Sequence, residues 1–210
     1  MSMQWAGLNW WRRVGLTLAG LALAGLGGCN RAKSTALDQS TPQAAVHSAI
    51  RAISEQNSQQ VRQCFLAQTS AQQAYVQAMG RLMEAAAAMA EKLRARFGRE
   101  AARDVIGSGG PSEEDFNRFV EGSQQINGSQ AQLTDSLGHV LVLRSVEGAW
   151  KIVPEGSGSG EPLQRQTDVL NAMAGVLTDV AADVNRFPEA QDIKGEILRR
   201  EEAVLNSKDK

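Results

Sequence analysis

Hydrophobic residues recur at helical spacing over most of this chain of 210 residues. Their spacing predicts a helix over residues 41–55 that starts with Thr41 as its N-cap, and a short second helix that follows Asn57. The longest predicted helix runs from Ser70 to about Phe97. Its apolar residues recur every three or four positions in one stripe, which we interpret as a core-packing surface: Tyr75, Met79, Leu82, Ala86, Met89, Leu93 and Phe97.

The pattern changes to the alternation of β-strands after residue 129. Residues 129–133 and 149–153 alternate between apolar and polar positions, and residues 139–144 form an apolar run between two turns. We therefore expect two or three antiparallel strands. Because Trp150 alternates with Lys151, one face of the last strand is apolar, and we expect the indole to be buried.

Helical spacing returns near the C-terminus. Residues 154–162 are rich in Gly and Ser and predict a flexible linker, and residues 163–205 predict a pair of helices. The first of these helices has a one-sided stripe of Val, Leu and Met, which favours burial against another element. We expect the pair to pack on a domain formed by residues 41–153. The predicted fold class is α+β, mostly helical, with a small antiparallel sheet and a C-terminal helical pair.

The N-terminal segment has the pattern of a secretory signal. Arg12 and Arg13 precede an uncharged run of 13 residues, Val14–Leu26. This run is shorter than the roughly 18–20 apolar residues that a helix needs to cross a bilayer. It ends in two small residues and a cysteine, Gly27-Gly28-Cys29.

The sequence Leu26-Gly27-Gly28-Cys29 resembles the lipobox of bacterial lipoproteins. The resemblance implies cleavage between Gly28 and Cys29, removal of residues 1–28, and a diacylglycerol on Cys29 Sγ that holds the protein on the membrane. Asn30 stands where lipoproteins kept at the inner membrane often have Asp, so it favours the outer membrane. Residues 29–40 are polar and aperiodic beyond the cysteine, and we interpret them as a lipidated flexible tether.

A second resemblance covers roughly residues 41–153. Thr41-Pro42-Gln-Ala-Ala-Val46 opens a helix pair, and Glu147-Gly148-Ala-Trp150-Lys-Ile-Val153 forms a late strand. Together they resemble the nuclear transport factor 2-like cone fold. This resemblance implies a cone-like sheet that encloses a cone-shaped pocket.

Composition limits the class of partner. Removal of residues 1–28 takes Arg12 and Arg13 from 22 Lys and Arg, which leaves 20 basic and 23 acidic residues and a net charge of −3. Such a balance gives no support for nucleic-acid binding. With Cys29 lipidated, Cys64 has no partner for a disulfide, and its spacing predicts a small core residue.

Few residues suggest chemistry. The two histidines, His47 and His139, have no metal-ligand spacing and no base-positioning partner in the sequence, so we expect structural or surface roles. No cofactor motif is present. A set of basic residues recurs at helical spacing and is interleaved with acidic ones: Lys92, Arg96, Arg99 and Arg103, with Glu91, Glu100 and Asp104. This pattern predicts a solvated face with internal salt bridges, and contact with phosphate headgroups of a membrane is the alternative.

The leading functional hypothesis is a non-enzymatic binding or interaction module of the bacterial cell envelope. A protein partner in the envelope is possible, and a small-molecule ligand is left open. The alternatives are a small hydrolase or isomerase that uses a cone-shaped pocket, and a structural helical spacer. A cavity with polar groups near Trp150 and Tyr75 would favour a ligand or an enzyme.

Overall fold

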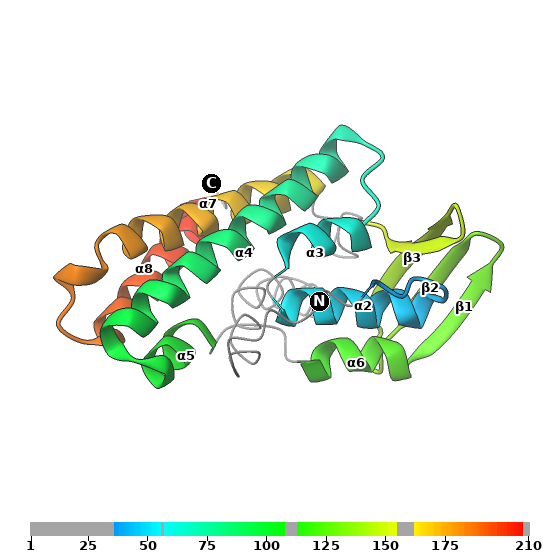
Figure 1. Ribbon diagram of the computed structural model, residues 1–210. Coiled ribbons are helices and arrows are strands. Elements are labelled where there is room, and N and C mark those ends of the chain that lie inside the picture. Colours follow the sequence, from blue (N-terminus) through cyan, green and yellow to red (C-terminus); the bar gives the residue numbers. More distant parts are fainter. Residues whose placement is uncertain (1–35, 56, 108–112, 155–161, 208–210) are drawn as a thin grey trace.

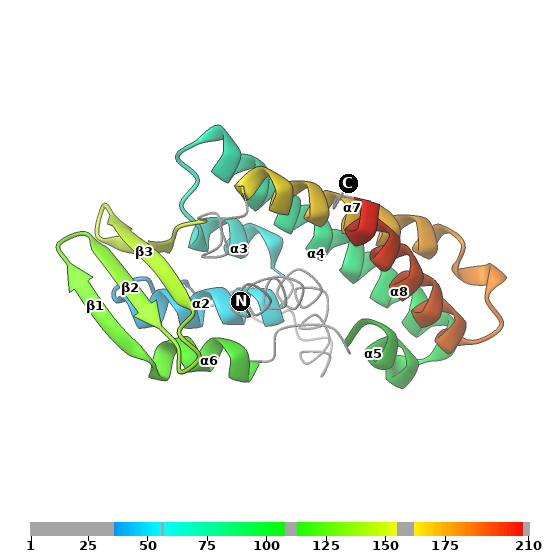
Figure 2. The ribbon, with the colours of Figure 1, turned by 180° about the vertical axis from the view of Figure 1, so that it is seen from behind.

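The computed structural model describes residues 36–55, 57–107, 113–154 and 162–207. The described part contains seven α-helices and one four-stranded antiparallel sheet (Figure 1). The predicted α+β class is therefore confirmed, with helix as the main component. The elements form two lobes, one helical and one that contains the sheet (Figure 1, Figure 2).

The two N-terminal helices begin at the caps that the sequence predicts. Helix α2 spans Pro42–Ser54, and the Thr41 Oγ1 accepts a hydrogen bond of 3.1 Å from the Ala44 N–H. Helix α3 spans Ser58–Cys64, and the Asn57 side chain caps it in the same way. Both caps satisfy N–H groups that have no partner within the helix.

The long helix α4 spans Ser70–Phe97, as predicted. Thr69 and Gln72 form a capping box at its start, and Gly98 ends it with a φ of 89°, which is a conformation that favours glycine. Helix α5, Arg99–Gly107, follows in a new direction. Because of this break, the basic residues of α4 and α5 do not share one continuous helix face.

Helix α7, Leu163–Ala182, lies side by side with α4 in both views of the ribbon (Figure 1, Figure 2). A short 3₁₀ helix, Val184–Arg186, leads into α8, Ala190–Ser207, which packs against α7 and α5. We call α4, α5, α7 and α8 the helical lobe. Its buried core includes Met79, Leu82, Met89 and Leu93 from α4, Met173, Leu177 and Val180 from α7, and Ile193 from α8.

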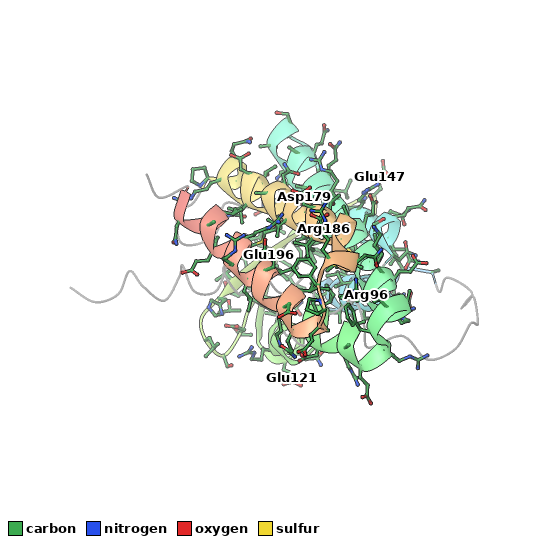
Figure 3. The ribbon with its side chains drawn as sticks, turned by 90° about the vertical axis from the view of Figure 1, so that its left-hand side faces the viewer. Arg96, Glu121, Glu147, Asp179, Arg186 and Glu196 are labelled. Carbon is green, nitrogen blue, oxygen red and sulfur yellow. The ribbon has the colours of Figure 1, made fainter. Side chains whose placement is uncertain are left out.

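Two basic residues of α4 bind the end of α7. The Lys92 Nζ donates to the carbonyl oxygen of Ala181 at 2.9 Å, and the Arg96 Nη1 donates to that of Val184 at 2.5 Å. The Ala181 carbonyl belongs to the last turn of α7, where acceptors have no donor within the helix, and the Val184 carbonyl lies in the 3₁₀ helix that follows. Figure 3 shows Arg96 beside the segment that connects α7 to α8. Lys92 and Arg96 are exposed, as expected, but they bond to main-chain carbonyls and not to the acidic residues of their own segment, because the α7–α8 connection lies opposite them.

Asp104 also contacts a neighbouring helix. Its carboxylate accepts from the Lys194 Nζ at 3.2 Å and from the Gln191 Nε2 at 2.5 Å. Both partners lie on α8, 87 and 90 residues further along the chain. The predicted pairing of Asp104 with basic residues of its own segment is replaced by contact between α5 and α8.

The sheet has the order β1-β2-β3-β4, one strand more than the upper limit of the prediction. Its strands are Ser123–Asn127, Gln130–Thr134, Val140–Val146 and Ala149–Ile152. The missed strand is β1, in which Ile126 is the single large apolar residue and is 54% exposed. This strand forms through backbone pairing with β2, so its side chains carry no strand pattern.

One face of the sheet packs on α2 and on α6, Glu113–Glu121. Directly paired residues share a face, and Leu143 lies opposite both Ala131 and Ile152. These side chains form a second buried cluster with Cys64, Phe119 and four residues of α2: Ala45, Val46, Ala49 and Ile50. The predicted burial of Cys64 is confirmed.

Trp150 was expected to be buried, and the structure shows it only partly buried, packed against the sheet cluster. It pairs with Ser145 next to the β3–β4 turn and packs on the rim of the sheet cluster. The strand is four residues long, and Ile152 occupies its deeper position. Strand alternation therefore placed Trp150 on the correct face but did not show how near it lies to the end of the sheet.

Candidate functional site

Helix α2 forms one wall of a partly open cavity of about 450 Å³. The lining residues come from the helix and from the segment before it: Asp38, Ala44, His47, Ser48, Ile50, Arg51 and Ser54. Among the helical members, Ala44, Ser48, Arg51 and Ser54 follow one another at separations of four, three and three positions and so lie on neighbouring parts of one face. The cavity combines space with two charged side chains of opposite sign, Asp38 and Arg51.

Residues 36–40 lie along α2 and complete the cavity. The Asp38 N–H donates to the Ser48 Oγ at 2.9 Å, and the Ser48 hydroxyl donates back to the carbonyl oxygen of Asp38 at 2.7 Å. On the other side, the Trp150 N–H donates to the carbonyl oxygen of Gln39 at 2.8 Å. These bonds hold the end of the segment that we interpreted as a flexible tether against both α2 and β4.

Asp38 carries the negative charge of the cavity. Its Oδ1 accepts from the Ser40 hydroxyl at 2.7 Å and from the Ser40 N–H at 3.1 Å. These bonds, and the positive charge of Arg51, hold the pKa of the Asp38 carboxyl below its usual value, although some desolvation opposes them. Asp38 is thus a carboxylate at neutral pH.

Arg51 carries the positive charge. Its Nη2 donates to the carbonyl oxygen of Ala36 at 2.9 Å, while its Nε is buried and has no hydrogen-bond partner. A buried donor without a partner costs about 1–3 kcal/mol, and more when the group is charged. The cavity therefore contains a cation whose donors are only partly used.

Cys64 lies close enough to Arg51 to be affected by its charge. Burial raises the pKa of the Cys64 thiol to about 11, and the positive charges of Arg51 and Lys151 offset this only in part. The thiol stays protonated at neutral pH, so it is a poor nucleophile. This agrees with the structural role predicted for Cys64.

The two histidines have different surroundings. His47 is exposed on the cavity face of α2. The His139 Nδ1 lies 2.8 Å from the Oδ2 of the buried Asp135, a partner that the sequence did not reveal. The Asp135 Oδ1 also accepts from the N–H groups of Leu137 and His139, so the pair stabilises the β2–β3 turn.

The pKa of Asp135 reflects this turn. Burial acts to raise it, but the hydrogen bonds from His139 and Leu137 outweigh burial and lower the pKa below its usual value. Asp135 is therefore charged, and both of its carboxylate oxygens form hydrogen bonds within the turn. It orients the His139 ring while it holds the backbone.

Tyr75 and Trp150, which we considered as a possible cavity pair, lie in different places. Tyr75 is 4% exposed in the core of the helical lobe, where burial raises its pKa, and Trp150 packs on the sheet cluster. The cavity instead lies on α2. Its charged residues Asp38 and Arg51 were missed because neither has a recognisable motif and they are 13 positions apart.

Other parts of the sequence analysis are not located in the structure. Gly28, Cys29 and Asn30 fall outside the described residues, as does most of the predicted linker. Within the described residues, no group of three His, Cys, Asp or Glu side chains could hold a metal ion. None of the described helices combines the length and apolar character that a membrane span requires.

Comparisons of the chain with protein-family models, with curated proteins and with solved structures find no match.

Proposed function

We propose that this protein is a lipoprotein of the bacterial cell envelope whose domain is a non-enzymatic binding module. The lipobox-like Leu26-Gly27-Gly28-Cys29 supports anchoring through a lipid on Cys29. In this proposal the domain faces the periplasm. Asn30 favours the outer membrane over the inner one.

The observation that carries the binding function is the α2 cavity, with Asp38 and Arg51 on its lining. A space of about 450 Å³ with a few converging polar groups is of the size that small-molecule sites have. Ala36, the tether residue whose carbonyl oxygen accepts a hydrogen bond from Arg51, lies seven positions after Cys29. An extended chain of that length spans about 25 Å at most, so the cavity is held near the membrane surface.

The groups around the cavity favour binding over catalysis. The Ser48 and Ser54 hydroxyls donate to the main-chain carbonyls of Asp38 and Arg51, at 2.7 and 2.9 Å. Nucleophilic catalysis needs a hydroxyl or thiol activated by a base or by a lowered pKa. The serines are engaged with the backbone, and the Cys64 thiol has a raised pKa.

The anchoring part is tested by Cys29→Ala in the native host. We expect the variant to lose incorporation of labelled fatty acid and to leave the membrane fraction, whereas a Cys64→Ala control keeps both properties. A Cys29→Ala protein that still incorporates fatty acid would show that the anchor has been assigned wrongly.

The binding part is tested with protein extracted from membranes in mild detergent and analysed by native mass spectrometry. We expect a small molecule to co-purify with the wild type and to be lost from Ser54→Trp, in which an indole occupies the cavity. Glu55→Trp is the matched control, because Glu55 is exposed beside the cavity and does not line it. Retention of the same molecule by Ser54→Trp would contradict a site at α2.

A further inference from the structure

Arg51 has donors that the protein itself does not use. One of its nitrogens, Nη2, bonds to the carbonyl oxygen of Ala36, and the buried Nε has no partner. The guanidinium is a planar fork whose paired N–H groups match the oxygens of a phosphate or carboxylate. The buried Nε is out of reach of a ligand, but the outer Nη1 end is not among the buried atoms, and because Arg51 lines the cavity, an oxyanion placed there would meet that end and the positive charge.

His47 is one helical turn before Arg51 and lines the same cavity. It is exposed, so its ring can turn to donate a hydrogen bond to a group that Arg51 holds. Residues four positions apart on a helix are neighbours on its surface. Arg51 and His47 therefore lie on the same side of the cavity.

Asp38 gives the cavity a second, opposite preference. Its Oδ1 is occupied by Ser40, which leaves Oδ2 as an acceptor on a fixed carboxylate. Asp38 and Arg51 affect each other through charge, but each is hydrogen-bonded to a different partner: Asp38 to Ser40, and Arg51 to Ala36. A ligand with only a negative charge would be repelled by Asp38, and one with only a positive charge would be repelled by Arg51.

We propose that the α2 cavity binds a small zwitterion, with its phosphate group on Arg51 and His47 and its ammonium group on Asp38. This inference rests on the proposed binding function and names the class of its ligand. A phosphoethanolamine group has this chemistry, both as a free phosphodiester and as the headgroup of a membrane lipid. The position of the cavity near the anchor makes both sources accessible.

The test uses the mature chain in detergent and three soluble compounds, with affinities from calorimetry. Glycerophosphoethanolamine carries both charges, glycerol 3-phosphate lacks the ammonium, and ethanolamine lacks the phosphate. We expect the wild type to bind the first compound at least about tenfold more tightly than either of the others, because each of those lacks one charged contact. Equal affinity for all three, or binding of none, would overturn the proposal.

Two variants locate the two charges. Arg51→Lys keeps the charge and loses the fork, and we expect on the order of tenfold weaker binding of glycerophosphoethanolamine. Asp38→Asn keeps the Oδ1 acceptor for Ser40, and we expect it to lose the preference for the ammonium-bearing compound over glycerol 3-phosphate. Glu55→Gln removes a nearby charge outside the lining and should change neither result. Unchanged affinity and preference in both cavity variants would refute the assignment.

The source of the ligand is distinguished with vesicles. Tighter association of the mature Cys29→Ala chain, which has no lipid anchor, with phosphatidylethanolamine vesicles than with phosphatidylcholine vesicles, lost when Asp38→Asn is added, assigns the lipid headgroup. Binding of the soluble compound without a difference between the vesicles assigns the free phosphodiester. If a molecule of another class co-purifies and is lost in Ser54→Trp, the binding function stands and the zwitterion proposal fails.

Discussion

Glu201 provides the sharpest test of the helical lobe. It lies on the apolar side of α8, where Ile193 and Ile197 precede it at four-residue spacing and Val204 follows. Only 8% of the surface of Glu201 is exposed, and burial raises the pKa of its carboxyl from 4.5 to about 7. A carboxylate at this position is therefore a cost to the folded state at neutral pH and above.

The size and sign of this cost follow from linkage. Between pH 4.5 and about 7 the folded state binds the Glu201 proton more tightly than the unfolded state does, so stability falls as the pH rises. Below pH 4.5 the carboxyl is protonated in both states, and the free energy of unfolding keeps its full contribution from Glu201. Above about pH 7 that contribution is lost, and the free energy of unfolding is lower by about 3 kcal/mol, at roughly 1.4 kcal/mol for each tenfold change in proton affinity.

The substitution Glu201→Gln removes the charge and keeps the shape of the protonated acid. We expect its free energy of unfolding to match the wild type at about pH 4 and to exceed it by about 3 kcal/mol at about pH 8.5. Urea denaturation followed by circular dichroism at the two pH values measures both differences. Glu202, the exposed neighbour, provides the control: Glu202→Gln should change the free energy of unfolding little at either pH.

The comparison between variant and wild type cancels the titration of all other groups. A Glu201→Gln variant that is equally or less stable than the wild type at the higher pH would refute the burial argument. A difference of the same size at both pH values would also refute it, because linkage requires the difference to grow as the carboxyl ionises.

Four further predictions test the packing. A chain that ends at Val153 lacks α7 and leaves the α4 stripe bare, so its thermal melt should lose cooperativity or it should aggregate; a melt equal to that of the full chain would make the C-terminal helices a separate unit. Arg96→Ala should lower the free energy of unfolding by about 1 kcal/mol or more, whereas the exposed Arg103→Ala should not. Gly122→Ala should destabilise, as a reduced urea midpoint, because a Cβ there would lie 2.0 Å from the Thr134 carbonyl oxygen. Cys64 should react with a thiol reagent only after denaturant is added, and immediate labelling of the native protein would contradict its burial.

Much of the helical part was predictable from the sequence because its signals are local. Thr41 caps α2, Asn57 caps α3, and Gly98 ends α4, each through contacts within a few residues of the chain. The α4 stripe could be identified because a helix that buries one face repeats its apolar residues every three or four positions. The inward position of Cys64 followed from the same rule.

The candidate site was not predictable in the same way. Asp38 and Arg51 are ordinary charged residues in the sequence, and the first lies in a segment that we interpreted as a tether. They line one cavity because Ser48 and Trp150 hold residues 38 and 39 against the domain from two sides. Such a contact depends on where β4 lies relative to α2, which no local pattern records.

The sequence by itself thus determined the class of the fold and most helix limits, since each depends on neighbours along the chain. Only the tertiary structure decided that β1 pairs with β2, that Lys92 and Arg96 bind the end of α7, and that Trp150 lies at the rim of the sheet. The physical reason is common to these cases. Backbone pairing, free helix ends and the edge of a sheet are satisfied by groups distant in sequence, and their partners become visible only when the elements are placed in space.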